Sequence, residues 1–263
     1  MKRGLIVYNA TDASKNQWFI NKCLNELNDD ELSLSYLDED FLLDYLSTHH
    51  LDFVIYRGRD YRLLEELEKR NIKTFNSSLT NKIANNKYLT FKLLEENNLP
   101  RIATYLDNSK LHDFPFIMKS VSGHGGLEVF LIDNITKQKA ILEQNPEISF
   151  IYQELLKNDG DVRLYVLDNR VVTAVKRLSS HDYRNNYSLG AHVSLFTPSK
   201  EMINDALKLA NLINATYVGV DFLLTDDGYR IIEVEDPVGS RMLYKVSAID
   251  IVSLYCAAIK EKI

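Results

Sequence analysis

The sequence predicts a mixed α/β protein, in which a small parallel α/β unit precedes two α+β units. Residues 1–77 alternate short apolar runs with segments of helical spacing, which is typical of parallel strands joined by helices. Beyond residue 100, strand patterns follow one another closely, and short turns between them indicate hairpins. The 263 residues are 45% hydrophobic and 26% charged, as is typical of a globular chain with a sizeable core.

The first unit is predicted to be a doubly wound domain over residues 1–77. Its short apolar runs predict strands, and the apolar positions between them recur at helical spacing. We expect strands at 5–8, 32–36, 52–56 and 72–75, and helices at 14–27, 39–48 and 61–70.

Two further units, at 78–153 and 154–263, follow from a change in pattern. A helix over 78–97 is expected to end before Leu99-Pro100, because proline disfavours a helical residue before it. The middle unit has expected strands at 115–119, 127–132 and 148–154 and a helix at 135–144. The last unit has expected hairpins at 162–178 and 217–235, a polar loop at 179–192, and helices at 199–213 and 246–262.

The composition excludes several classes of protein. A net charge of −6 with no long basic run argues against a general nucleic-acid binder. No apolar run approaches the ~20 residues that a membrane span needs. The apolar run after the first three residues is too short for a signal peptide, so we expect a cytoplasmic protein without a membrane partner. Cys23 and Cys256 are too few for a cysteine-rich zinc site, and we expect both to be buried.

The first candidate for chemistry is a glycine-rich loop. Gly123, Gly125 and Gly126 fall between two predicted strands, where backbone amides can approach a phosphate. The loop lacks the pattern of a Walker A loop or a dinucleotide fingerprint, and a plain flexible hairpin is an equally good interpretation. Lys119 ends the strand before the loop and Lys87 lies on the preceding helix, although each alone is typical of a solvated lysine.

The strongest candidate is a group of three acids on the last hairpin. If the turn has three residues with a left-handed glycine, Thr225 pairs with Tyr229 and Asp221 stands opposite Glu233. Glu235 then lies on the same face, whereas a two-residue turn would put Asp221 on the other face. Carboxylates gathered on one face repel one another unless a cation binds them, and oxygen ligands suit Mg²⁺. The alternative is a solvated edge strand, which the apolar residues between these acids disfavour.

Basic and amide side chains also occur at the end of the first hairpin and in the polar loop after it, and such side chains suit phosphate oxygens. They are Lys176 and Arg177 at the end of a strand, and Arg184, Asn185 and Asn186 in the polar loop. A two-residue turn at 168–169 places Asp161 opposite Lys176, for which a surface ion pair is the plain interpretation.

In this order, the motifs resemble those of the ATP-grasp family. The likeness is closest to its RimK-like branch of ribosomal-protein glutamate ligases and related amino-acid and peptide ligases. It covers nearly the whole chain, and it lies in the order and spacing of the motifs rather than in any one of them. The matching segments are 75–78 with 84–90, 118–126, 152–156, 160–163, 182–186, 220–221 and 233–235.

The resemblance implies an ATP-grasp fold, with ATP and one or two Mg²⁺ ions (or Mn²⁺) as cofactors. It implies that the metal is bound by Asp221, Glu233 and Glu235, and that the catalytic residues are Arg177, Arg184 and Asn186. It also implies nucleotide contacts from Lys87, Lys119, Gly123, Gly125, Gly126, Gln153, Glu154, Leu155, Leu156, Asp161, Lys176, Arg184 and Asn185.

One position departs from the family pattern. Where the family usually has Asn as its third metal-associated residue, this chain has Glu235, which keeps an oxygen ligand and adds a negative charge. Candidates for binding a substrate carboxylate are Arg57 and Arg59, at the carboxyl end of a predicted strand, and Arg241, after the metal-binding strand. Solvated surface arginines are the plain alternative.

The resemblance further implies an ATP-dependent carboxylate–amine ligase that forms an amide bond through an acyl phosphate. The expected substrate is an amino acid or a small peptide, and homodimers are common in the family. A nucleotide-binding regulatory protein without turnover is an alternative, which Glu235 favours. A small-molecule kinase with the same fold is another.

Overall fold

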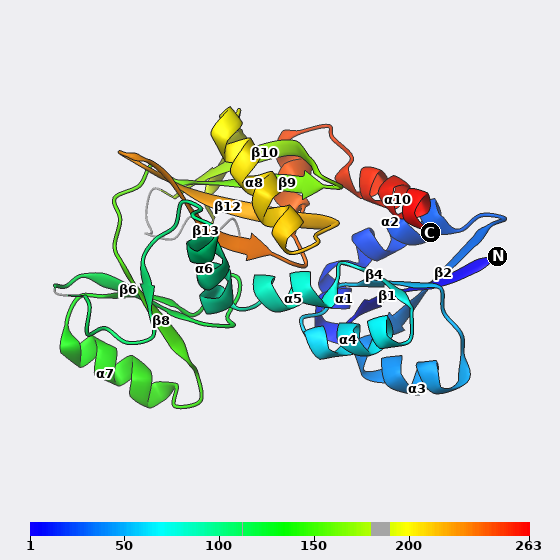
Figure 1. Cartoon of the computed structure of the whole chain (residues 1–263), viewed down its shortest axis with the longest axis horizontal. Coiled ribbons are helices and arrows are strands. Elements are labelled where there is room, and N and C mark those ends of the chain that lie inside the picture. The colour runs from blue at the N-terminus through cyan, green and yellow to red at the C-terminus, as the bar shows by residue number, and fades with distance from the viewer. Residues whose placement is uncertain (112, 180–189) are drawn as a thin grey trace.

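The computed structural model describes residues 1–111, 113–179 and 190–263 (Figure 1). In this part the chain forms one parallel and two antiparallel sheets, which confirms the expected α/β class. Arg184, Asn185 and Asn186 lie outside the described residues. No helix within the described ranges is both long and apolar enough to cross a bilayer.

The N-terminal sheet is parallel with the order β2-β1-β3-β4, as the alternating pattern predicts. Its strands are β1 (Lys2–Tyr8), β2 (Leu32–Asp38), β3 (Phe53–Tyr56) and β4 (Lys73–Phe75). They are joined by α1 (Ala10–Lys15), α2 (Gln17–Leu27), the 3₁₀ turn η1 (Glu39–Phe41), α3 (Leu42–Thr48) and α4 (Tyr61–Lys69). Both faces of β1 are covered, because Val7 and Tyr8 belong to two different apolar clusters.

Two helices that the sequence pattern predicts as continuous are interrupted at asparagines, so these predictions are wrong. The helix expected at 14–27 is instead α1 and α2, with Asn16 between them. The helix expected at 78–97 is instead α5 (Ser78–Ala84) and α6 (Lys87–Glu96).

The start of α6 shows the physical reason for the second interruption. Asn86 has an extended backbone, and its side-chain oxygen accepts a hydrogen bond from the Leu89 amide at 3.0 Å. The Asn85 side chain donates to the Asp236 carbonyl at 2.8 Å. Asparagines that bond in this way compete with helix continuation and begin a new helix. The new helix places Lys87 at its first turn.

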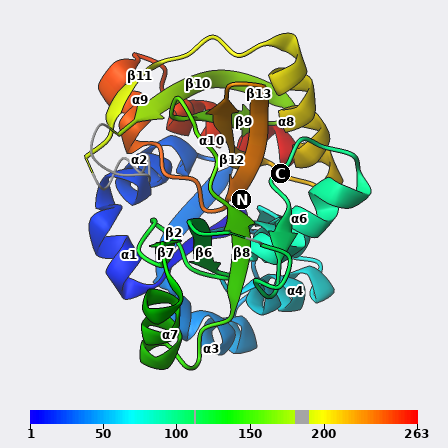
Figure 2. The ribbon, with the colours of Figure 1, turned by 90° about the vertical axis from the view of Figure 1, so that its left-hand side faces the viewer.

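The middle sheet is antiparallel with the order β5-β8-β6-β7. Its strands are β5 (Thr104–Tyr105), β6 (Phe116–Ser120), β7 (Val129–Ile132) and β8 (Phe150–Glu154). The helix α7 (Ile135–Gln144) lies on its outer side, where Ile141 packs against the apolar cluster around Met118 (Figure 2).

The C-terminal sheet is also antiparallel, with the order β11-β10-β9-β12-β13. Its strands are β9 (Asp161–Leu167), β10 (Arg170–Leu178), β11 (His192–Leu195), β12 (Tyr217–Thr225) and β13 (Gly228–Glu235). One face packs against α8 (Lys200–Leu212), where Leu164, Val220 and Leu209 share one apolar cluster. Since side chains alternate along a strand, the other face of β9 and β12 presents the residues between these apolar positions.

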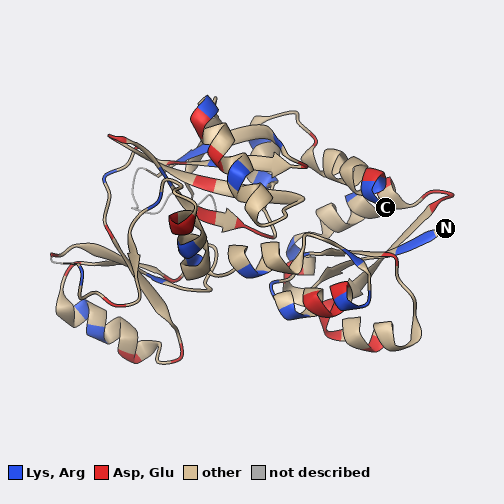
Figure 3. Cartoon of the chain, in the orientation of Figure 1, with Lys and Arg blue, Asp and Glu red and all other residues tan. Residues whose placement is uncertain are grey.

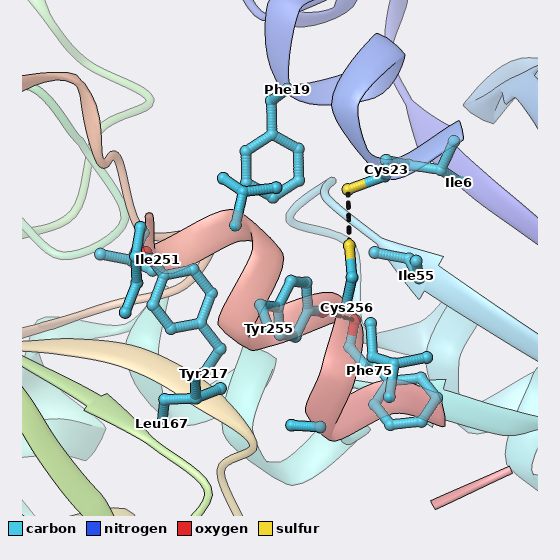
Figure 4. Packing of buried hydrophobic residues seen from close by; sticks show 14 of the residues in the cluster. Ile6, Phe19, Cys23, Ile55, Phe75, Leu167, Tyr217, Ile251, Tyr255 and Cys256 are labelled. Carbon is cyan, nitrogen blue, oxygen red and sulfur yellow. Dashed lines mark hydrogen bonds between the residues drawn. The ribbon is translucent and has the colours of Figure 1, made fainter. Parts of the chain in front are cut away.

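The C-terminal end of the chain returns to the N-terminal sheet. The last segment is α9 (Arg241–Val246) and α10 (Ile251–Lys262), and α10 packs against α2. Figure 4 shows this core, in which the sulfur atoms of Cys23 and Cys256 lie 3.8 Å apart. Both cysteines are buried, as the sequence predicts. The same cluster includes Tyr165 and Tyr217, so it joins the first and last sheets.

Replacing Asn86 by Ala is expected to lower the free energy of unfolding by about 1 kcal/mol, because α6 loses its capping acceptor. Urea denaturation measures this change. Asn86→Asp is the matched control, because its carboxylate keeps an acceptor at the same place. Equal stability of the Ala variant and the wild type would contradict the capping role.

Candidate functional site

A cleft lies between the middle and C-terminal sheets, and residues from both sheets line it. Figure 3 shows that acidic positions of β12 and β13 lie next to α6, which contacts β13. The site residues expected from the sequence that line it are Lys87, Lys119, Gly123, Gly126, Gln153, Glu154, Leu155, Leu156, Asp161, Arg177, Asp221 and Glu233. Glu235 lines a smaller neighbouring pocket together with Glu233 and Arg59.

The register of three neighbouring strands brings the charged residues together. Asp221 on β12 stands opposite Arg163 on β9 and opposite Glu233 on β13. Glu235 is two residues further along β13, on the same face as Glu233. The three carboxylates each offer one oxygen, and these oxygens lie within 4.8 Å of one another. Clustered carboxylate oxygens are a donor set that fits Mg²⁺ or Mn²⁺.

The hairpin that gathers these acids differs from the expected one. Thr225 pairs with Gly228, so the turn has two residues instead of three. A β-bulge at Ile232 shifts the register and restores the pairing of Asp221 with Glu233. The expected pair is therefore confirmed, whereas the turn length used to derive it is wrong.

The carboxylate of Asp221 is buried and held by two guanidinium groups. Arg163 donates to Oδ1 from Nε and to Oδ2 from Nη2, both at 2.7 Å, and Arg177 donates to Oδ2 at 2.6 Å. Burial alone raises the pKa of Asp221, but the two arginines lower it to about 2. Arg163 also contacts Glu235 at 2.7 Å. Asp221 therefore stays charged at neutral pH inside the protein.

Arg163 has no functional role in the sequence-based interpretation. A signal for it is present nonetheless, because Asp161 and Arg163 are charged residues that alternate with apolar ones. Such a pattern predicts a strand with one charged face. The sequence of this strand does not reveal which residues of other strands pair with its charged side chains.

The expected pairing of Asp161 with Lys176 is wrong. A bulge at Val172 shifts the register of β9 and β10, so Asp161 stands opposite Arg177 and forms a buried ion pair with it. Burial raises the pKa of Asp161 to about 6, although Arg177 opposes this shift. Lys176 stands opposite Val162 instead, on the other face of β10 from Arg177.

Two lysines approach the acids from the opposite side of the cleft. Lys87 contacts Glu233 Oε1 at 3.2 Å and donates a hydrogen bond to the Gly123 carbonyl. Burial lowers the pKa of Lys119 to about 8, with Lys87 adding to the decrease and Glu233 opposing it. Two neighbouring ammonium groups beside a pocket suit an anionic ligand such as a polyphosphate.

The glycine-rich loop crosses one side of the cleft between β6 and β7. Gly125 and Gly126 have left-handed φ angles of +70° and +75°, which glycine adopts without strain. The Gly123 amide donates to the Ser120 hydroxyl at 3.0 Å. A Cβ atom at Gly123 would meet the Glu128 carboxylate, so a side chain there would require the flexible Glu128 to move.

The cleft is lined by apolar side chains as well as charged ones. Ile102, Ile117 and Leu223 line it, and none of these three apolar residues is among the expected site residues. Gln153 also lines the cleft and donates to the Thr104 hydroxyl at 2.6 Å. Apolar side chains with a polar amide among them suit a flat heteroaromatic ring with polar edges.

The three arginines expected to bind a substrate carboxylate have different environments. Arg57 is buried and donates to the Val238 carbonyl at 2.8 Å, so its placement favours a role in joining the sheets. Arg59 contacts Asp12 at 2.9 Å and borders the small pocket beside Glu235. Arg241 is exposed and lies 3.4 Å from Asn16.

Comparison with known proteins supports the family assignment. The model of the RimK-like ATP-grasp domain matches residues 84–259. The tetrahydromethanopterin:alpha-L-glutamate ligase of Methanocaldococcus jannaschii is 31% identical over 184 residues, which cover 64% of this chain and 63% of that protein.

Two solved ligases have the same fold. The D-alanine–D-alanine ligase of Bacillus anthracis superimposes with a TM-score of 0.80 at 15% identity, covering 99% of this chain and 96% of that one. The ATP-grasp ligase PsnB, solved with a phosphomimetic variant of its minimal precursor, Mg and ADP, gives a TM-score of 0.71 at 17% identity, covering 99% of this chain and 98% of that one. The present chain belongs to the RimK-like ATP-grasp family of carboxylate–amine ligases, which form C–N bonds.

Replacing Arg177 by Met is expected to lower the free energy of unfolding by about 3–5 kcal/mol, because two buried carboxylates lose a partner. Thermal and chemical denaturation measure the loss. In the control Arg230→Met, the broken pair with Asp227 is largely exposed, so a loss of about 0–1 kcal/mol is expected. Similar losses in both variants would contradict the importance of the buried pairs.

Proposed function

We propose that this cleft binds ATP with Mg²⁺ and joins a carboxylate to an amine through an acyl phosphate. The observation that carries the proposal is the grouping of three carboxylates opposite two lysines beside a glycine-rich loop. ATP transfers its γ-phosphoryl group to the substrate carboxylate and leaves as ADP. The amine then attacks the acyl carbon and the C–O bond to phosphate breaks, so that phosphate and one proton from the amine are released as the amide forms.

Positioning and charge neutralisation are the main tasks of the protein in such a reaction. Lys87 and Lys119 would hold the phosphates, and the apolar residues of the cleft, together with Gln153, would hold the adenine. Asp221, Glu233 and Glu235 would hold the metal, which supplies Lewis-acid neutralisation of the phosphate charge. Arg177, together with Arg184 and Asn186, would steady the transferred group.

The glycine-rich loop would limit access of water to the acyl phosphate, because water hydrolyses this intermediate and no amide forms. Its two left-handed glycines allow the backbone to lie close to the phosphates. The backbone amides of Gly125 and Gly126 are the proposed donors, and Gly123, whose amide is bonded to the Ser120 hydroxyl, shapes the loop.

For the substrates, we propose an amino acid or a short peptide in a cytoplasmic reaction. The name of the Methanocaldococcus jannaschii relative makes glutamate the first amine to test. Arg59, which borders the pocket beside Glu235, is the best-placed of the three arginines to meet a substrate carboxylate. We also propose that the protein forms a homodimer and that its domains are residues 1–77, 78–153 and 154–263.

A nucleotide-binding regulatory protein is the second candidate function. It is favoured by Glu235, which is paired with Arg163 where the family usually has Asn. Such a protein binds ATP and releases no phosphate with any carboxylate and amine. A small-molecule kinase, in contrast, releases ADP without an amide product.

Glu233→Ala is expected to abolish phosphate release, because it removes a metal ligand and the partner of Lys87. The assay is a phosphate-release screen over pairs of amino acids with ATP and Mg²⁺, followed by mass spectrometry of positive reactions. Glu201→Ala on the exposed surface of α8 is the control and should retain the wild-type rate. A wild-type rate in Glu233→Ala would contradict the metal assignment.

Lys119→Met is expected to weaken ATP binding by about 10–100-fold, since a hydrogen bond to a charged group contributes roughly 1.5–3 kcal/mol. Isothermal titration calorimetry with a non-hydrolysable ATP analogue and Mg²⁺ measures the affinity. Lys92→Met, which removes a surface pair with Glu95, is the matched control. Unchanged affinity in Lys119→Met would place the nucleotide elsewhere.

A further inference from the structure

Arg163 connects two of the three candidate metal ligands. Its guanidinium group binds both oxygens of Asp221 at 2.7 Å and one oxygen of Glu235 at 2.7 Å. Its side chain is only 7% exposed, so the contacts are made away from bulk water. Paired ions at such short distances in a partly dry site interact strongly.

The backbone leaves room for this reach. Gly219 stands opposite Glu235 in the ladder and next to the Arg163 side chain. A Cβ atom at Gly219 would lie 3.0 Å from Arg163 Cδ, 3.2 Å from Arg163 Nε and 2.9 Å from a methyl group of Val238. The absence of a side chain at this glycine therefore allows Arg163 to extend along the sheet to Glu235.

A divalent ion needs the same oxygens that the arginines occupy. Both oxygens of Asp221 accept hydrogen bonds from guanidinium groups, because Arg163 binds Oδ1 and Oδ2 and Arg177 also binds Oδ2. An incoming ion would also be repelled by the fixed positive charge of Arg163. The polyphosphate of a nucleotide reduces this repulsion, because it brings several negative charges to the same place.

We propose that Arg163 is a positioning residue that keeps divalent ions off Asp221 and Glu235 until the nucleotide is present. This inference rests on the proposed function, since it assumes that the carboxylates are metal ligands. It also gives Glu235 a role that Asn could not fill, because a neutral amide would not form an ion pair with Arg163. The ion therefore enters with the nucleotide rather than before it.

The test is a titration of the full chain with Mn²⁺ alone, in which electron paramagnetic resonance counts the free ion. The wild type is expected to bind Mn²⁺ weakly in the absence of nucleotide. Arg163→Met and Arg163→Gln are expected to bind it about tenfold more tightly or better, because the competing charge is gone. Arg163→Lys keeps the charge and is expected to remain close to the wild type.

One control separates the role of Arg163 from the loss of a positive charge, and a second variant guards against misfolding. Arg230→Met also removes one positive charge from the chain, but Arg230 lies near the start of β13 and pairs with Asp227, so the Mn²⁺ affinity of this variant should equal that of the wild type. Arg163→Gln can still donate a hydrogen bond to Asp221, which protects the fold if Arg163→Met does not fold. Circular dichroism checks the fold of each variant.

The outcomes distinguish this inference from the proposed function. If the wild type binds an ATP analogue with Mg²⁺ but also binds Mn²⁺ alone as tightly as Arg163→Gln does, the role of Arg163 is overturned and the ligase proposal stands. If the wild type binds no ATP analogue with Mg²⁺, the proposed function fails, and so does the inference that rests on it.

Discussion

The pairing of Asp221 with two arginines is the interaction on which the site depends. A buried carboxylate is strongly destabilising unless cations bind it directly. Arg163 and Arg177 provide these cations from β9 and β10, and Asp161 and Glu235 then pair with the arginines in turn. The resulting chain of ion pairs extends over four neighbouring strands. It gives the C-terminal sheet one charged face, opposite the face that packs on α8.

The sequence predicts the three acids of this charged face and the pairing of Asp221 with Glu233, but not the pairs that the arginines form. Charged and apolar residues alternate over residues 161–164, and Asp221 stands between Val220 and Phe222, as strand geometry predicts for a strand with one apolar face. The bulges at Val172 and Ile232 have no such signal, because a β-branched apolar residue is equally typical of a regular strand. At Ile232 the bulge compensates for a shorter turn, so the predicted pair is correct by cancellation of two errors. At Val172 the turn has the predicted length, so the bulge shifts the register. Arg177 therefore stands opposite Asp161 in place of the predicted Lys176.

Long-range packing is the other part that the sequence does not reveal. Arg57 follows a strand, as a cleft residue of a parallel sheet would, yet it is buried against the Val238 carbonyl, 181 positions along the chain. The contact between Cys23 and Cys256 likewise depends on α10 returning to α2. Helix spacing predicts that each residue is buried, but not which residue covers it. Only the complete fold brings these partners together.

The buried charges of the C-terminal sheet bear on whether its inner face binds a ligand or serves only the stability of the fold. Replacing buried ion pairs by apolar side chains of similar size is often neutral or stabilising. Stability alone therefore does not require Asp161, Arg177, Asp221 and Arg163 on the inner face of the sheet. Their position beside Lys87 and Lys119 favours a site that meets a ligand with several charges of its own. Glu235 fits this interpretation, because it forms an ion pair with Arg163 beside Asp221 and Glu233.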